Sequence, residues 1–181
     1  MLINIILIIV VIISGAILIN YNKFVKKNNK VKERESYIDV LLNQRFDLIP
    51  NIVECVKGYA SHESSTLEEL TNLRSNYNKN TYSIKDNEVI DKKFNNVMLL
   101  AEAYPDLKAN EQFLSLQRNL NEIENNLSNA RASYNRAVNV YNNLVESVPS
   151  NIIAKIFGFE KKEFFKLEED KKANVSVNLE N

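Results

Sequence analysis

The side chains that most often perform chemistry in proteins are scarce in this sequence. It contains one histidine, His62, and one cysteine, Cys55. Their spacing on one helix is two turns, about 10 Å, so thiol and imidazole could not share a hydrogen bond as nucleophile and base. A di-metal site in a helical bundle needs two Glu-x-x-His motifs, and a single histidine cannot supply both. Zinc-protease, phosphate-loop and nucleophile-elbow motifs are missing from the sequence. We therefore expect no enzyme, no cofactor and no metal ion; only chemistry based on carboxylates alone stays open.

Composition narrows the function further. Lysine and arginine together number 23, as do aspartate and glutamate, so the net charge is zero and we expect no nucleic-acid partner. A single cysteine excludes an internal disulfide and suits a reducing compartment. Because Cys55 stands among Ile52, Val53 and Val56, we expect a small hydrophobic residue on a helix rather than a reactive thiol. The many asparagines are interpreted as surface residues that reflect genomic base composition, without chemistry of their own.

Two groups of polar residues interrupt or flank the apolar stripes and form the candidate site. The groups are Asp39, Arg45, Asp47 and Asn51, and then Glu102, Asp106 and Lys108. Such residues could line a polar groove that binds a partner protein or a lipid head group. A scaffold role is favoured instead, in which Arg45 pairs with a carboxylate on a facing helix. Asp106 would then cap the N-terminus of the helix that follows, with Glu111 in its early turns.

The N-terminal segment must position this site, and it begins with an apolar run over residues 2–19. This run contains no charged side chain. As a helix the run would span about 27 Å, close to the hydrocarbon thickness of a bilayer. We expect residues 1–20 to form a retained transmembrane anchor. A buried core helix would seldom be this long without a polar face. A cleaved signal peptide is disfavoured because no basic segment precedes the run.

A basic segment, residues 21–37, follows the run directly, and we expect it to form a juxtamembrane neck. Four lysines are expected to contact anionic lipid head groups: Lys23, Lys26, Lys27 and Lys30. Basic residues beside a span stay on the cytoplasmic side of the membrane. We therefore predict that the N-terminus lies outside and that the following domain is cytoplasmic.

Helical periodicity dominates the rest of the chain. An apolar stripe at helical spacing runs from Ile38 to Tyr59, and Pro50 must kink or split that helix. A capping-box pattern begins at Ser65, so a new helix starts there or the first one continues, and the sequence leaves both possibilities open. Residues 78–87 are polar without periodicity and predict a loop. A second helical stripe runs from Val89 to Tyr104.

The clearest pattern is a seam that alternates spacings of three and four residues for about five heptads. Its members are Phe113, Leu116, Leu120, Ile123, Leu127, Ala130, Tyr134, Ala137, Tyr141, Leu144 and Val148. This spacing predicts a long straight helix in a left-handed bundle or coiled coil. The expected fold is all-α: one N-terminal transmembrane helix, then a long antiparallel up-and-down bundle of the four-helix type.

The C-terminal part is expected to complete the bundle, which covers residues 38–170. A short amphipathic piece after Pro149 should stop at Gly158. A second piece, residues 159–165, should plug one bundle end with Phe164 and Phe165. Residues 171–181 form a polar tail, expected to be disordered, with a short strand as the alternative.

Several sequence blocks resemble those of the LemA family of bacterial membrane proteins. They are IDVLLNQRFDLIPNIVECVKGYASHE (residues 38–63), AEAYPDLKANEQFLSLQ (101–117), ARASYNRAVNVYN (130–142), PSNIIAKIFGFEKKEFF (149–165) and YNKFV (21–25). The resemblance covers nearly the whole chain in the same order. It implies one N-terminal membrane helix followed by an antiparallel helical bundle. It implies no established activity, cofactor or catalytic residue.

Together these observations predict a membrane-anchored scaffold or interaction protein at the bacterial plasma membrane. Its expected partners are the bilayer and an unidentified protein, a membrane protease being one candidate through the resemblance. A homo-oligomer is also compatible with the sequence. The alternative function is a lipid-binding or envelope-facing sensor with the bundle outside.

Overall fold

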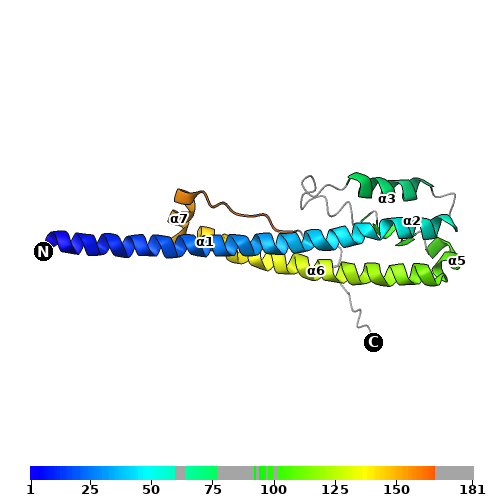
Figure 1. The fold of residues 1–181 in the computed structure, drawn as a ribbon, viewed down its shortest axis with the longest axis horizontal. Helices are drawn as coiled ribbons and strands as arrows, with labels where there is room; N and C mark the ends of the chain where they lie inside the picture. The colour runs from blue at the N-terminus through cyan, green and yellow to red at the C-terminus, as the bar shows by residue number, and fades with distance from the viewer. Residues whose placement is uncertain (60–63, 77–91, 93, 97, 100–101, 166–181) are drawn as a thin grey trace, which may run out of the picture.

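The computed structural model describes residues 1–181 except 60–63, 77–91, 93, 97, 100–101 and 166–181 (Figure 1). Its helices are α1 (Leu2–Asp47), α2 (Ile49–Lys57), α3 (Ser64–Asn76), α5 (Pro105–Lys108), α6 (Glu111–Glu146) and α7 (Ser150–Phe157). The described part of the chain contains no strand. The fold is therefore all-α, and it is dominated by the long helices α1 and α6.

The helix α1 is continuous through both the apolar run and the basic segment that follows. It has 46 residues and contains no proline, and its single glycine, Gly15, is not enough to break it. The helix ends at Asp47 because Pro50 cannot donate the main-chain hydrogen bond that would continue the turn. Pro50 instead occupies the first turn of α2, a position where no such donor is needed. Of the two possibilities at Pro50, the structure shows the split.

The first part of α1 stands apart from the rest of the molecule. No residue from Leu2 to Ile19 is buried, and most side chains there are exposed isoleucine, leucine or valine. This segment is long and apolar enough to cross a membrane. A core helix of a soluble protein would be mostly buried, so the features fit a membrane anchor or a signal sequence. Figure 1 shows the segment as a bare arm of α1 that extends beyond α6.

Beyond this arm, α1 packs against α6 in an antiparallel pair. Near the arm the ring of Phe24 lies 6.3 Å from that of Tyr141, and farther along Arg45 reaches Glu124. Residue numbers therefore rise along α1 as they fall along α6. The first residue of α1 to be fully buried is Phe24, within the segment expected to be a neck.

The seam predicted for α6 is largely confirmed. Buried members are Phe113, Leu120, Leu127, Ala130, Tyr134 and Tyr141, with Leu116, Ile123, Ala137 and Leu144 partly buried. The prediction for Val148 is wrong, because this residue lies beyond the end of α6 and is 80% exposed. A residue before proline avoids helical backbone, so the helix ends before it reaches Val148. Val138 and Asn142 are buried on α6 instead.

The end of the pair far from the bare arm carries α2, α3 and α5. Figure 1 shows α3 alongside α2 and the short α5 at the tip. Leu67 and Leu70 of α3 are buried there, as is Phe94, which lies in helical backbone. The predicted loop and several members of the second stripe, including Val89 and Val97, lie outside the described residues.

The C-terminal part matches the expectation for one piece and contradicts it for the other. The helix α7 ends at Gly158, whose φ of 71° is the left-handed conformation that glycine adopts at helix ends. Residues 159–165, here called the strap, form no helix and do not plug a bundle end. The strap runs back along the α1–α6 pair, so that Phe165 is buried while Phe164 remains 47% exposed. The predicted polar tail, residues 171–181, lies outside the described residues.

Candidate functional site

Two asparagines of α6 hold the strap by paired hydrogen bonds. The side-chain amide of Asn142 donates to the carbonyl oxygen of Lys162, and its oxygen accepts from the Lys162 N–H, both at 2.9 Å. Asn135 makes the same pair with Phe165, at 2.8 Å in each direction. An asparagine side chain offers both a donor and an acceptor, so each one satisfies both main-chain groups of one strap residue.

The distance between the two asparagines on α6 matches the distance between their two partner residues on the strap. The two asparagines are separated by two turns of α6, about 10 Å, and three residues of extended chain also span about 10 Å. The general interpretation of asparagine as a mere surface residue is therefore wrong at Asn135 and Asn142. A Tyr-Asn pair recurs at heptad spacing, at residues 134–135 and 141–142, and this was the signal in the sequence.

Aromatic contacts fix both ends of the strap. Phe159 stacks on Phe24 of α1, with ring centroids 4.6 Å apart and planes 8° from parallel. Phe165 meets Tyr134 edge-on, with centroids 5.0 Å apart. The Tyr134 hydroxyl also donates to the carbonyl oxygen of Glu163. Burial, with smaller contributions from Glu35 and Glu163, raises the pKa of Tyr134 to about 12. The strap therefore belongs to the packed structure.

Arg45 is the one member of the predicted polar cluster that lies in the core. Its side chain is almost fully buried, and its Nη2 lies 2.6 Å from Oε1 of Glu124 on α6. The guanidinium carbon also lies 4.1 Å from the ring centre of Phe94. Because a buried charge needs a partner, this ion pair favours the observed register of α1 against α6. The geometry is that of the helix-pairing bridge that the sequence suggested.

The other members of the cluster occupy separate places near the far end. Asp39 is half-buried on α1, and Asp47 is exposed, with Oδ1 3.8 Å from Nη2 of Arg74 on α3. Asn51 lines a cavity on α2. The remaining three, Glu102, Asp106 and Lys108, are exposed in and beside α5. Arg45 and Asp47 thus form ion pairs with residues that do not belong to the predicted cluster.

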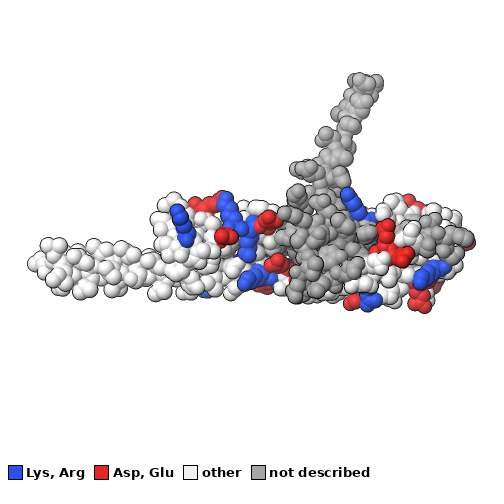
Figure 2. All heavy atoms as spheres, turned by 90° about the horizontal axis from the view of Figure 1, so that it is seen from above, with Lys and Arg blue, Asp and Glu red and all other residues white. Residues whose placement is uncertain are grey.

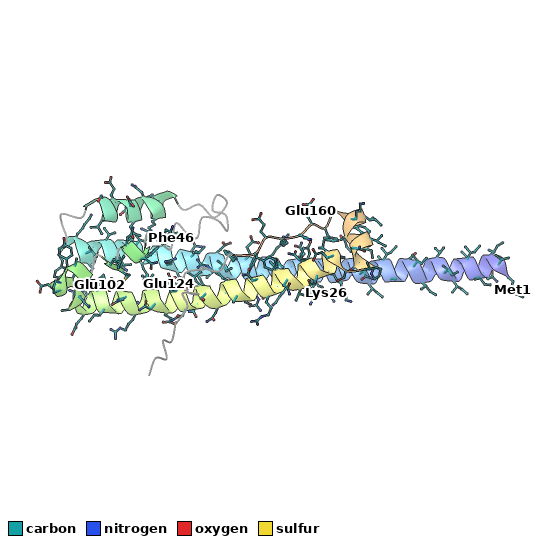
Figure 3. All side chains as sticks on the ribbon, turned by 180° about the vertical axis from the view of Figure 1, so that it is seen from behind. Met1, Lys26, Phe46, Glu102, Glu124 and Glu160 are labelled. Carbon is teal, nitrogen blue, oxygen red and sulfur yellow. The ribbon has the colours of Figure 1, made fainter. Side chains whose placement is uncertain are left out.

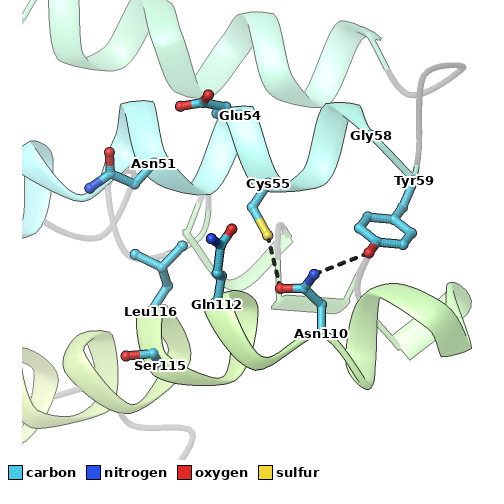
Figure 4. A pocket seen from close by; sticks show the side chains of 9 residues that line it. All are labelled: Asn51, Glu54, Cys55, Gly58, Tyr59, Asn110, Gln112, Ser115 and Leu116. Carbon is cyan, nitrogen blue, oxygen red and sulfur yellow. Dashed lines mark hydrogen bonds between the residues drawn. The ribbon is translucent and has the colours of Figure 1, made fainter.

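The cavity beside Asn51 is an open depression of about 600 Å³ between α2 and the start of α6 (Figure 4). Its hydrogen bonds centre on Asn110, whose oxygen accepts from the Phe113 N–H (2.9 Å) and the Cys55 thiol (3.6 Å). The Asn110 amide donates to the Tyr59 hydroxyl at 3.0 Å. Asn110 is therefore the N-cap of α6, and the prediction that Asp106 caps this helix is wrong. Asp106 lies too early, in the separate turn α5, while Glu111 does occupy the first turn of α6.

The cavity offers hydrogen-bonding groups rather than a nucleophile. Burial, with a smaller contribution from Glu54, raises the pKa of the Cys55 thiol. The thiol therefore stays protonated, and a protonated thiol is a poor nucleophile. His62 lies outside the described residues. Among the residues that the structure describes, no cluster of histidine, cysteine or carboxylate side chains could hold a metal ion.

The basic residues beside the bare arm lie on the surface of α1. Lys23, Lys26, Lys27 and Lys30 are exposed, and Lys30 pairs with Glu33 at 2.7 Å. This lysine lowers the pKa of the Glu33 carboxyl. Figure 2 shows charged side chains only beyond the bare arm of α1. The boundary between apolar and charged surface therefore falls at one level along the helix.

These features define an all-helical protein with one N-terminal apolar helix that runs on into a packed helical domain. The profile of the LemA family matches residues 34–179, and the chain belongs to this family. No catalytic activity is known for the family.

Individual relatives are distant. The magnetosome proteins MamQ 1 and MamQ 2 of Paramagnetospirillum magneticum are each 23% identical, over 86% of this chain and 68% of theirs. Protein LemA of Metamycoplasma hominis is 21% identical, over 86% of this chain and 73% of its own. Each match extends over most of both chains.

Proposed function

We propose that this protein is a membrane-anchored helical scaffold that presents an interaction surface at the plasma membrane of a bacterium. The observation that carries the proposal is the continuity of α1. One helix contains both the exposed apolar arm and, from Phe24 onward, the buried residues that pack against α6. Lipid is the environment in which such an arm is stable, because water would leave its apolar surface uncovered.

The level at which packing begins supports an anchor that ends near Asn20. The pair Phe24 and Tyr141 is the outermost aromatic contact between α1 and α6, and α6 ends five residues later, at Glu146. The chain then turns away at Ser147 instead of following the apolar arm. A second protein helix along the arm would replace lipid, and none of the described residues provides one.

We further propose that the domain is cytoplasmic, with the N-terminus outside. Exposed Lys23, Lys26 and Lys27 beside the arm support this orientation, since basic residues near a span stay on the cytoplasmic side. The same lysines would contact anionic head groups. The packing of α2 on α6 and α1, and of α3 on α2, supports a bundle of the four-helix type.

The proposed partner surface is the exposed far end, which bears Asp47, Glu102, Asp106 and Lys108. Its distance from the arm would let the scaffold reach a protein above the membrane surface. A membrane protease and a second copy of the chain are the candidate partners. Crosslinking in the native membrane from a photoreactive residue at Asp106 would identify the partner, with exposed Asn121 as the control position.

Thiol labelling tests the orientation. Cys55 is a poor probe because it is half-buried with a raised pKa, so the background is Cys55→Ala. In intact cells an impermeant maleimide should leave Asn121→Cys unlabelled until lysis. Labelling of Asn121→Cys in intact cells would overturn the cytoplasmic orientation. That result would favour the alternative, a lipid-binding or envelope-facing sensor with the bundle outside.

A further inference from the structure

The short helix α7 lies at the junction between the bare arm and the packed pair. Figures 1 and 3 both show α7 running across the axis of α1 rather than along it. The ring of Phe157 lies 5.0 Å from that of Tyr21, which directly follows the expected anchor. If α1 stands upright in a bilayer, α7 therefore lies parallel to the membrane surface and at its level.

One side of α7 is firmly attached to the rest of the protein. Ile153 and Ala154 are buried. The Ser150 hydroxyl shares its one proton between the carbonyl oxygens of Leu144 (2.7 Å) and Ser147 (2.9 Å) at the end of α6. The glycine at its C-terminal end lets the chain turn into the strap, which is itself held on α6. The position of α7 is thus fixed from both ends.

The outer side of α7 is apolar and exposed. Ile152 and Ile156, one turn apart, are 58% and 69% exposed, and Phe157 is 47% exposed. Just before the helix, Val148 is exposed as well. The only charged residue of the helix is Lys155, and its sequence has no carboxylate. An apolar face with a single lysine beside it is the pattern of a helix that lies in a membrane interface.

We propose that α7 is a second membrane contact, whose outer face enters the boundary between head groups and acyl chains of the leaflet from which α1 emerges. This inference rests on the proposed anchoring of α1. Lipid is the occupant because α7 contacts α1 at Tyr21, two residues beyond Ile19, and the arm up to Ile19 exposes the same kind of apolar side chain. A second copy of the chain would have to displace lipid from the arm to reach α7.

In this arrangement the outer face lies about 5–10 Å deep, and Lys155 extends its ammonium group back toward the phosphates. The contact would hold the domain at two points, α1 and α7. Two points resist the rotation and tilt that a single helix permits. The strap, which continues directly from α7, would transmit this constraint to the middle of α6.

Depth-dependent fluorescence quenching tests the proposal on the full chain. Single cysteines in the Cys55→Ala background are labelled with an environment-sensitive dye and reconstituted in phosphatidylethanolamine and phosphatidylglycerol vesicles. The vesicles carry nitroxide lipids, either near the head group or deep in the acyl chain. The positions are Ile156→Cys on α7, Ile9→Cys on the arm and Asn121→Cys on the exposed surface of α6.

The expected result is loss of emission at Ile156→Cys with the shallow nitroxide, at Ile9→Cys with the deep one, and at Asn121→Cys with neither. Quenching at Ile9→Cys without quenching at Ile156→Cys would overturn the role of α7 and leave the anchor intact. Absence of quenching at both would overturn the anchor as well. A blue-shifted but unquenched Ile156→Cys label would mean that a second copy covers α7, which also contradicts the proposal.

Discussion

The side chain of Asn142 and the main chain of Lys162 are joined by two hydrogen bonds of 2.9 Å, one in each direction. Asn142 is buried on α6, and Lys162 lies in an extended segment with no neighbouring strand among the described residues. The asparagine therefore does for the strap what a partner strand does in a sheet. This relationship leads to the first prediction.

Replacing Asn142 with alanine should lower the free energy of unfolding by about 1–3 kcal/mol, because the N–H and carbonyl of Lys162 lose their partners. Chemical unfolding of the full chain in detergent micelles, followed by circular dichroism, measures the change. Asn139→Ala is the matched control, since Asn139 is exposed on the same helix. Equal stability of the two variants would contradict a structural role for the pair.

Breaking the Arg45–Glu124 pair should be costly because Arg45 is buried. We expect Arg45→Ala to reduce the free energy of unfolding by about 2 kcal/mol or more. The double variant Arg45→Met with Glu124→Gln should recover part of this loss, since neither charge is then left unpaired. Thermal unfolding compares them with Arg118→Met, which removes an exposed arginine from α6. A loss no larger than that of Arg118→Met would show that the pair adds nothing to stability.

The buried seam can be tested with a charge. Leu120→Asp or Leu127→Asp would bury an unpaired carboxylate, at a cost of several kcal/mol, about enough to unfold a marginal domain. Leu114→Asp is the control, because Leu114 lies on the same helix and is 38% exposed. The melting temperature should fall strongly for the first two variants and little for the third. An unchanged melting temperature for Leu127→Asp would mean that the register of α6 is wrong.

Tyr134 should make stability depend on alkaline pH. Its pKa in the folded protein is about 12, above the ordinary value of 10.0, so the folded state keeps the proton that the unfolded state loses. Stability should hold below pH 10 and decline as the pH rises toward 12, because unfolding then releases a proton. Tyr134→Phe should weaken this decline, whereas the exposed Tyr37→Phe should preserve it. Unfolding curves measured between these pH values give the slope of stability against pH. If this slope is the same in Tyr134→Phe as in the parent protein, Tyr134 is not the cause of the decline.

The orientation should depend on the basic residues beside the arm. Changing Lys23, Lys26, Lys27 and Lys30 to glutamine should send some chains into the membrane with the domain outside. A reporter fused after Asn181 would then give a mixed signal instead of a cytoplasmic one. Arginine at the same four positions keeps the charge and should keep the orientation. If the glutamine variant stays wholly cytoplasmic, another feature sets the topology.

The helices could be predicted because burial imposes a period that the sequence displays. Leu120, Leu127 and Tyr134 follow that period, and they are buried as expected. The break at Pro50 was one of two possibilities, because a proline alone does not determine whether a helix bends or restarts. The prediction was wrong at Val148 because this residue fits the period but precedes a proline, where the backbone leaves the helix.

The site was less predictable because its contacts join residues distant in sequence. The sequence indicated that Arg45 needs a carboxylate, but choosing Glu124 requires the register of α1 on α6. The cap of α6 by Asn110 depended on where that helix starts, within one turn. The strap depended on hydrogen bonds between side chain and main chain over 20 to 30 residues, which leave no hydrophobic period.

Because α1 is one unbroken helix, the rotation of the apolar arm about the helix axis fixes the rotation of the packed domain about the same axis. Each residue added between Ile19 and Phe24 would rotate the packed domain relative to the arm by about 100° about the helix axis. It would also move the domain about 1.5 Å farther from the arm. A tilt of about 10° at the arm would swing Asp47 sideways by about 7 Å, given the rise per residue of a helix. The first helix thus acts as a lever. A change in the tilt of its apolar end displaces the far tip of the molecule, while the packing between the helices stays the same.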